Sequence, residues 1–216
     1  MPTIKILPQL AFGGGWYTAL YFTNTSASPN LLILSFMGND GYPLAIPALG
    51  GSSFLVNIAA RGTALVEAPN VGSLAQGYVT AALPTGVTGY GVLRQSVAGA
   101  PDQEAVVPLS GSTATTSTLL FDDTKYVTGV AVVNLASVNS TITAVARDNQ
   151  GSSLGSASIP LGPNAKIALA LRSIPGLASV AGKIGSVDFA SATGNVAALG
   201  LRFNGAAFTS IPTSDR

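Results

Sequence analysis

The chain has neither cysteine nor histidine among its 216 residues. It therefore has no thiol nucleophile, no Ser-His-Asp triad and no imidazole for general acid–base catalysis. The usual nitrogen and sulfur ligands of zinc and copper are missing as well. We expect a protein that is not an enzyme, with no catalytic residue, no cofactor and no bound metal.

Charged side chains are also scarce, at 9% of the residues against about 25% in typical soluble domains. The net charge is +1 without a cluster of Lys or Arg, which argues against nucleic acid and anionic membranes as partners. Apolar residues reach 47%, yet no run approaches the roughly 20 apolar residues of a spanning helix, so no membrane insertion is expected. Such a chain either covers itself with Ser, Thr, Asn and Gly or buries part of its exterior in an assembly.

Paired carboxylates, as in glycosidases, are the remaining route to catalysis. The nine acidic residues fall almost entirely in turn-like or linker-like segments, where a carboxylate caps backbone amides. Asp122 and Asp123 could offer two oxygens to Ca²⁺, but such a site needs about six to eight and no calcium-binding loop follows. We interpret these acids as turn residues.

Two further features suggest ligand sites but have simpler explanations. The run Gly13-Gly14-Gly15 precedes Trp16 instead of a Lys-Ser/Thr pair and a helix, so we expect a flexible turn and no phosphate loop. Arg94 and Arg202 could bind a carboxylated ligand, but we expect each to stack on a neighbour or to form an ion pair.

An internal repeat organises the chain. Segments of the first half match segments of the second half at a shift of 110 positions, and both copies of the first segment end in Asn. The order of the matches is preserved, which predicts that the halves are related by internal duplication. The matched segments are 16–24 with 126–134, 32–36 with 142–146 and, after a gap of three, 54–58 with 167–171.

The seam between the halves lies in 110–117, a run of small polar residues with the composition of a linker. This places domain one at 1–110 and domain two at 111–216. Each domain is long enough to bury a core of its own.

Within each half, runs of β-branched and aromatic residues alternate with clusters of Gly, Pro, Asn and Asp. This pattern is typical of antiparallel β-sandwiches and predicts an all-β fold. Asn39-Asp40-Gly41 and 148–151 predict hairpin turns. Ile46-Pro47 and Ile159-Pro160 predict the start of an edge strand, and 171–180 is expected to hold a helical turn.

A resemblance supports this fold. The pattern comprises Gly-Gly-Gly-Trp at 13–16, a strand ending in Thr23-Asn24, and the closing Leu-Arg-Phe-Asn-Gly-Ala-Ala-Phe-Thr-Ser-Ile-Pro at 201–212. It resembles the tandem Ig-like β-sandwich repeat of secreted soil-bacterial proteins of the Acidobacteria type, a family without an assigned activity. The resemblance implies two Ig-like domains and export. Because 1–4 lacks the features of a signal peptide, we expect a mature segment of a secreted or cell-surface protein.

The first predicted hairpin of domain one, formed by 16–24 and the strand that follows it, suggests a binding surface. Period-two alternation points Trp16, Thr18, Leu20 and Phe22 into the core, with the Trp16 indole between the sheets. Tyr17 and Tyr21 then face outward, and the next strand is expected to add Ile33 and Met37 to the same outer face. The predicted binding or interface residues are therefore Tyr17, Tyr21, Ile33 and Met37.

Three interpretations of this patch are open. Loops or the second domain could cover it, sugar rings could stack on its aromatic residues, or another subunit or protein could bind it. We favour a non-catalytic extracellular structural or adhesive module that mediates protein contacts or self-assembly, including homo-oligomers. The alternative is a carbohydrate-binding module of a secreted system that degrades polysaccharides.

Overall fold

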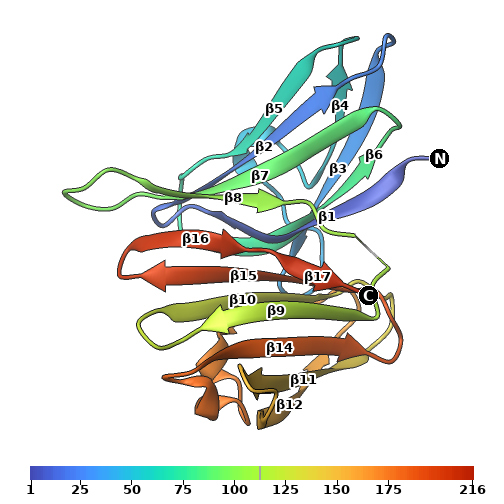
Figure 1. Ribbon diagram of the computed structural model, residues 1–216. Coiled ribbons are helices and arrows are strands. Elements are labelled where there is room, and N and C mark those ends of the chain that lie inside the picture. Colours follow the sequence, from blue (N-terminus) through green and yellow to red (C-terminus); the bar gives the residue numbers. More distant parts are fainter. Residues whose placement is uncertain (112) are drawn as a thin grey trace. The chain divides into compact units, whose positions relative to one another are not determined.

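The computed structural model describes residues 1–111 and 113–216 and is all-β, with three short 3-10 helices in the described residues (Figure 1). The chain divides into two compact units, Met1–Gly111 and Ser112–Arg216. The division falls within the predicted linker 110–117, in which Ser112 lies outside the described residues. The predicted linker extends too far, because the first strand of the second unit begins at Thr116.

The first unit, unit 1, consists of two four-stranded antiparallel sheets with the strand orders β1-β6-β3-β4 and β5-β2-β7-β8. The short helix η1 (Pro47–Leu49) lies between β3 and β4. The strands are β1 (Thr3–Phe12), β2 (Trp16–Asn24), β3 (Asn30–Gly38), β4 (Ser53–Ile58), β5 (Thr63–Ala68), β6 (Ala75–Leu83), β7 (Val87–Gln95) and β8 (Gln103–Pro108).

The second unit, unit 2, has the sheets β12-β11-β14-β9-β17 and β13-β10-β15-β16. Two short helices, η2 (Leu171–Ser173) and η3 (Ala178–Val180), lie in the segment expected to hold a helical turn. The strands are β9 (Thr116–Asp122), β10 (Val127–Asn134), β11 (Ser140–Asp148), β12 (Ser153–Leu161), β13 (Lys166–Ala170), β14 (Ile184–Ser191), β15 (Val196–Asn204), β16 (Ala207–Ile211) and β17 (Thr213–Asp215).

The strand order is the same in the two units. The sheet β1-β6-β3-β4 corresponds to β9-β14-β11-β12, and β5-β2-β7-β8 corresponds to β13-β10-β15-β16. This order differs from that of an Ig domain, whose first strand lies beside the second, because β1 pairs with β6. Duplication of one ancestral unit stays a prediction. The common order nevertheless assigns each strand of unit 1 a counterpart in unit 2.

The registers correct part of the sequence alignment. The strands β3 and β11 occupy equivalent places at the expected shift of 110. The match of 54–58 with 167–171 is wrong, because 54–58 lies in β4, which pairs with β3, and the counterpart strand that pairs with β11 is β12. The cause is the long connection of unit 1 between β3 and β4, which contains η1 and has no equivalent between β11 and β12.

A leucine of one sheet packs on a glycine of the other in both units. A Cβ atom on Gly91 of β7 would stand 2.6 Å from a methyl carbon of Leu7 in β1. A Cβ atom on Gly200 of β15 would stand 2.4 Å from a methyl carbon of Leu119 in β9. The absent side chain lets a buried leucine fill the space between the sheets, where removal of its apolar surface from water stabilises the fold by roughly 2 kcal/mol.

The turn predictions are partly correct. Gly41 and Gly151 have φ values of 83° and 81°, as tight turns after β3 and β11 require. Pro160 lies in β12, the edge strand of its sheet, as expected, but it stands near the end of that strand and not at its start. Ile46-Pro47 does not start an edge strand, because Pro47 is the first residue of η1. A proline fits there, since the first turn of a helix leaves its N–H groups without helical partners.

Trp16 is only half-buried, whereas Thr18, Leu20 and Phe22 of the same strand are buried. The burial of Thr18, Leu20 and Phe22 is therefore as predicted, but Ala19 between them is buried as well and the indole does not lie fully between the sheets. Trp16 is the first residue of β2, directly after the turn whose Gly13 carbonyl accepts its backbone N–H. Its place at the end of the sheet explains the incomplete burial.

A buried asparagine is the last residue of β2 in unit 1 and of its counterpart β10 in unit 2. The Nδ2 group of Asn24 donates to the carbonyls of Ser28 at 2.8 Å and Ala59 at 3.0 Å, and its Oδ1 accepts the N–H of Ser26. Asn134 makes the equivalent bonds, to the carbonyls of Val138 and Gly162 and from the N–H of Ala136. This side chain fixes the loop through which the chain leaves one sheet and enters the other.

Candidate functional site

The predicted patch does not exist as one surface. Tyr17 and Tyr21 lie on β2, which pairs with β5 and β7, whereas Ile33 and Met37 lie on β3, which pairs with β4 and β6. The two strands belong to different sheets, so their outward side chains lie on opposite outer faces of unit 1. The prediction failed because it took β2 and β3 as a hairpin. The loop that Asn24 holds instead carries the chain across the sandwich.

The first of these surfaces, called the aromatic face, consists of Tyr17, Tyr21, Leu65 and Tyr90. A row of directly paired residues crosses all four strands of the sheet, from Leu65 through Tyr21 and Tyr90 to Pro108. The rings of Tyr21 and Tyr90 stack with their centroids 5.3 Å apart and an interplanar angle of 18°. Leu65 is 49% exposed and Tyr90 is 42% exposed, so this row meets solvent.

Charged residues beside the aromatic face already have hydrogen-bond or ion-pair partners. The Tyr17 hydroxyl donates a hydrogen bond to Glu67, and the Arg94 guanidinium lies 5.0 Å above the centre of the Tyr17 ring. Arg94 also forms an ion pair with Glu104, with Nη2 and Oε1 2.5 Å apart. Partial burial, together with the bond to Glu67 and its negative charge, raises the pKa of Tyr17 to about 12. The tyrosine is therefore a neutral donor at physiological pH.

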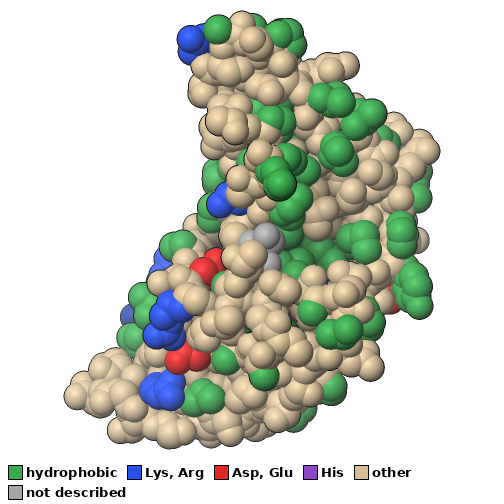
Figure 2. Space-filling model, turned by 90° about the vertical axis from the view of Figure 1, so that its right-hand side faces the viewer, with side chains coloured by type: hydrophobic (Ala, Val, Ile, Leu, Met, Phe, Trp, Pro, Cys, Tyr) green, Lys and Arg blue, Asp and Glu red, His purple; other side chains and the backbone are tan. Residues whose placement is uncertain are grey.

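The second surface, called the aliphatic face, consists of Ile4, Leu31, Ile33 and Leu55 on the sheet β1-β6-β3-β4. A row of paired residues again crosses all four strands, from Ile4 through Ala82 and Ile33 to Leu55. The four side chains are between 43% and 67% exposed. A shallow pocket of about 390 Å³ lies beside Leu31 and Ile33 and is also lined by Met1, Pro2 and Pro84 among others. In Figure 2, hydrophobic side chains are spread over unit 1, the upper part of the picture, and charged ones are few.

Met37 contributes little to either surface. It is partly buried, pairs with Tyr78, and bridges to Pro43 in the turn after β3. The predicted patch lacks Leu65, Tyr90, Leu31 and Leu55, although alternation within their own strands marks these residues as outward. What the sequence does not reveal is which strands lie side by side, and this pairing decides which outward residues form one surface.

The acidic residues act within the structure. Asp40, Asp122 and Asp148 accept backbone N–H bonds in turns, as predicted. Glu67, Glu104 and Asp188, by contrast, lie within strands. Among the described residues, no group of three or more acidic side chains could hold a metal ion.

Asp123 is buried and does more than form a turn. It pairs with Arg172 of η2 at 2.6 Å, and its other oxygen accepts the N–H of Thr128. Arg172 also donates to the carbonyl of Tyr126, while the guanidinium of Arg202 lies 4.7 Å above the Tyr126 ring. Arg94 and Arg202 both stack on a tyrosine, as the sequence suggested.

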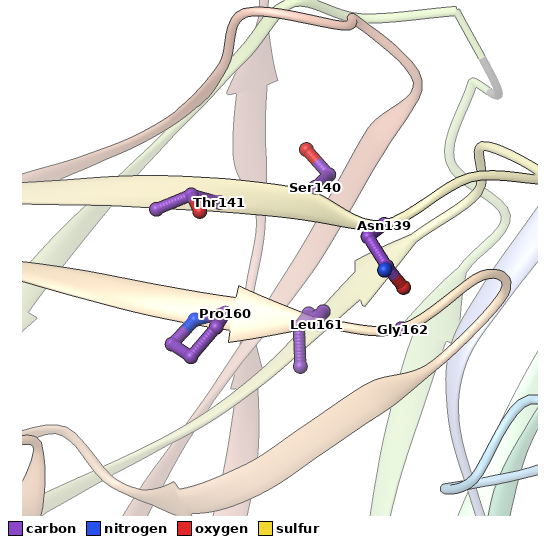
Figure 3. Close-up of a pocket in the computed structure, with 6 residues that line it drawn as sticks. All are labelled: Asn139, Ser140, Thr141, Pro160, Leu161 and Gly162. Carbon is purple, nitrogen blue, oxygen red and sulfur yellow. The ribbon is translucent and has the colours of Figure 1, made fainter.

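A pocket of about 360 Å³ in unit 2 offers little chemistry (Figure 3). It lies along β11 and β12 and is lined by Asn139, Ser140, Thr141, Pro160, Leu161 and Gly162. The Ser140 side chain points away from β12 in Figure 3, and its hydroxyl is bonded to those of Ser191 and Thr193 at 2.9 and 3.0 Å. No charged residue lines this pocket.

No protein family, curated protein or solved structure matches the chain. Within the described residues, no helix is long and apolar enough to cross a membrane.

Proposed function

We propose that the protein is a non-catalytic structural or adhesive module of the bacterial cell exterior, which binds another protein surface through the aromatic face. The observation that supports this proposal is the row of Leu65, Tyr21 and Tyr90 across the sheet, in which Leu65 and Tyr90 are exposed and Tyr21 between them is partly buried. Tyrosine is enriched in the centres of protein interfaces, where its ring is buried and its hydroxyl finds a partner.

The geometry favours a protein partner over a sugar. A carbohydrate-binding platform offers ring faces to the sugar. Tyr21 and Tyr90 instead stack on each other, and Arg94 occupies one face of the Tyr17 ring. Rings in this arrangement present edges and hydroxyl groups, which pack into an apolar protein surface. Carbohydrate binding is the alternative function.

A charge at the centre of the aromatic face tests the proposal. Tyr21→Lys should abolish self-association or partner binding, because it places an ammonium group in a contact that must lose its water. Sedimentation velocity measures the association, and circular dichroism confirms folding. The matched control is Tyr42→Lys, which changes a 71% exposed tyrosine in the turn after β3.

Pull-down with insoluble polysaccharides completes the test. If Tyr21→Lys removes polysaccharide binding and leaves a monomeric state unchanged from wild type, the carbohydrate-binding alternative replaces the proposal. If Tyr42→Lys has the same effect as Tyr21→Lys, the aromatic face is not the binding surface.

A further inference from the structure

The aliphatic face is an addition to unit 1 that the fold itself does not require. The equivalent row in unit 2 joins Thr116, Ala190, Thr143 and Ser158 by the same pairings that join Ile4, Ala82, Ile33 and Leu55. Unit 2 thus forms this sheet with two threonines and a serine at the places of the three large apolar side chains. The fold of the sheet therefore does not explain why unit 1 has large apolar side chains at these outward positions.

We propose that the aliphatic face of one copy binds the aromatic face of a second copy, so that the chains assemble head to tail. This inference rests on the proposed function and names its partner. Both rows are four strands wide, so the two surfaces match in extent. Face-to-face packing of two such sheets, about 10 Å apart, would repeat the layering already present inside each sandwich.

The charges of the two faces agree with this pairing. Outward positions of the aliphatic face and its strands β3, β4 and β6 carry no charged side chain among the described residues. On the aromatic face, Arg94 is paired with Glu104, and Glu67 accepts the bond from Tyr17. Each surface therefore suits a largely apolar partner, which describes the opposite face of the same unit.

The exposed apolar area approaches the apolar part of a standard interface. A standard interface buries about 800 Å² per partner, of which roughly 450 Å² is apolar. Four large side chains exposed by 43% to 67%, as on the aliphatic face, present roughly a few hundred Å² of apolar surface. This contribution is much of the apolar area that one partner buries, and the other residues of the sheet supply the rest of the interface.

The position of the faces determines the kind of assembly. Because they lie on opposite sides of one sandwich, a contact between them leaves one free face at each end of a pair. Further copies can then add, so the assembly grows into open chains and does not stop at a dimer. A symmetric dimer through the aromatic face alone would leave the aliphatic face unused.

Two blocking variants test this arrangement. Tyr21→Lys blocks the aromatic face and Leu55→Lys blocks the aliphatic face, at a side chain that is 67% exposed. Sedimentation velocity should show wild-type species larger than dimers whose size grows with concentration. Each variant alone should be monomeric, and an equimolar mixture should form a 1:1 heterodimer of twice the monomer mass, because each partner supplies one intact face.

Controls and contrary outcomes separate this inference from the proposed function. Val71→Lys changes a 68% exposed side chain in a loop of unit 1 and should assemble like the wild type. Ile33→Lys repeats the aliphatic test should Leu55→Lys fail to fold by circular dichroism. If Tyr21→Lys blocks association while both aliphatic variants associate normally, the aromatic face binds protein but the head-to-tail contact is wrong. A monomeric wild type, or a mixture that stays monomeric, also overturns the inference.

Discussion

Single polar side chains decide where the chain of this protein crosses between sheets. Asn24 and Asn134 are buried, and each satisfies backbone groups of a loop and of an edge-strand end at once. The sequence repeat ends in this residue in both halves, and the hydrogen bonds explain why. A shorter or purely apolar side chain could not serve these carbonyl groups.

Removing the amide donor should therefore destabilise the unit that contains it. Asn134→Ala leaves the carbonyls of Val138 and Gly162 without their bonds, which should cost about 1 to 3 kcal/mol of unfolding free energy. Asn134→Asp keeps the shape but cannot donate, and it should cost at least as much. Urea unfolding measures both. Asn139→Ala, at an exposed position of the same loop, should change stability little, and an equal loss there would contradict this role.

Tyr17 of the aromatic face should make the stability of the protein depend on pH in the alkaline range. Burial and Glu67 raise the pKa of Tyr17 to about 12, while burial alone raises that of Tyr78 to about 12. The neutral phenol is favoured by folding, so its contribution to stability is complete below about pH 10 and is lost as the pH rises toward 12.

Ultraviolet titration of the tyrosines should follow from this assignment. Tyr17→Phe should remove one of the late-titrating tyrosines, and Glu67→Gln should move one tyrosine to lower pH, because the negative charge is gone but burial remains. An unchanged titration curve in Glu67→Gln would mean that the hydrogen bond between Tyr17 and Glu67 does not form in solution.

At the scale of the strands, two glycines allow neighbouring backbones to approach. Gly77 of β6 and Gly185 of β14 occupy equivalent places, because they pair with Gly38 and Asp148 at the ends of β3 and β11. A Cβ atom would stand 2.0 Å from the carbonyl oxygen of Met37 in one case and 1.9 Å from that of Arg147 in the other. Backbone atoms cannot move aside without breaking the ladder.

Gly77→Ala and Gly185→Ala should therefore each lower the free energy of unfolding by about 3 kcal/mol or more, which is at or above the usual range for overpacking. Gly51→Ala in unit 1 and Gly162→Ala in unit 2 are matched controls, since the nearest atoms would lie 3.8 Å away and neither backbone has a positive φ. The controls should stay within about 1 kcal/mol of wild type. If thermal unfolding shows that Gly77→Ala is as stable as Gly51→Ala, the backbones at Gly77 and Met37 do not approach each other this closely.

The strands also show which features of the fold the sequence predicts and which it does not. Alternation within a strand predicts burial well, as Thr18, Leu20 and Phe22 show, because a pleated strand has only two sides. Strand pairing is not local information. From the sequence, the loop after Asn24 could either close a hairpin or cross the sandwich. Because it crosses, Tyr21 and Ile33 lie in different sheets. The equivalence of 54–58 with 157–161 was missed for a related reason, since a long insertion shifts the register.

For the whole molecule, the division into units predicts independent folding of unit 2. A cluster of buried apolar side chains in unit 2 runs from Leu119 to Ala198 and contains no residue of unit 1, and the strands of its sheets pair only within the unit. A chain of about 100 residues can bury enough surface to fold alone. The segment Ser112–Arg216 should therefore unfold in a single cooperative urea transition. A gradual loss of circular dichroism signal would show that unit 2 needs the rest of the chain.

Low charge shapes how the whole molecule should associate. With a net charge of +1 and 9% charged residues, there is little repulsion between copies and little to attract them by charge. Raising NaCl from about 0.1 M to about 1 M shortens the screening length from roughly 10 Å to 3 Å, which would weaken a contact between copies that depends on charges. An apolar contact should persist, and sulfate should strengthen it because this anion is excluded from protein surfaces. Sedimentation velocity at one protein concentration measures both effects. If the mass falls toward that of the monomer in NaCl, charges hold the copies together, and Arg94 and Glu104 beside the aromatic face are the pair to change first.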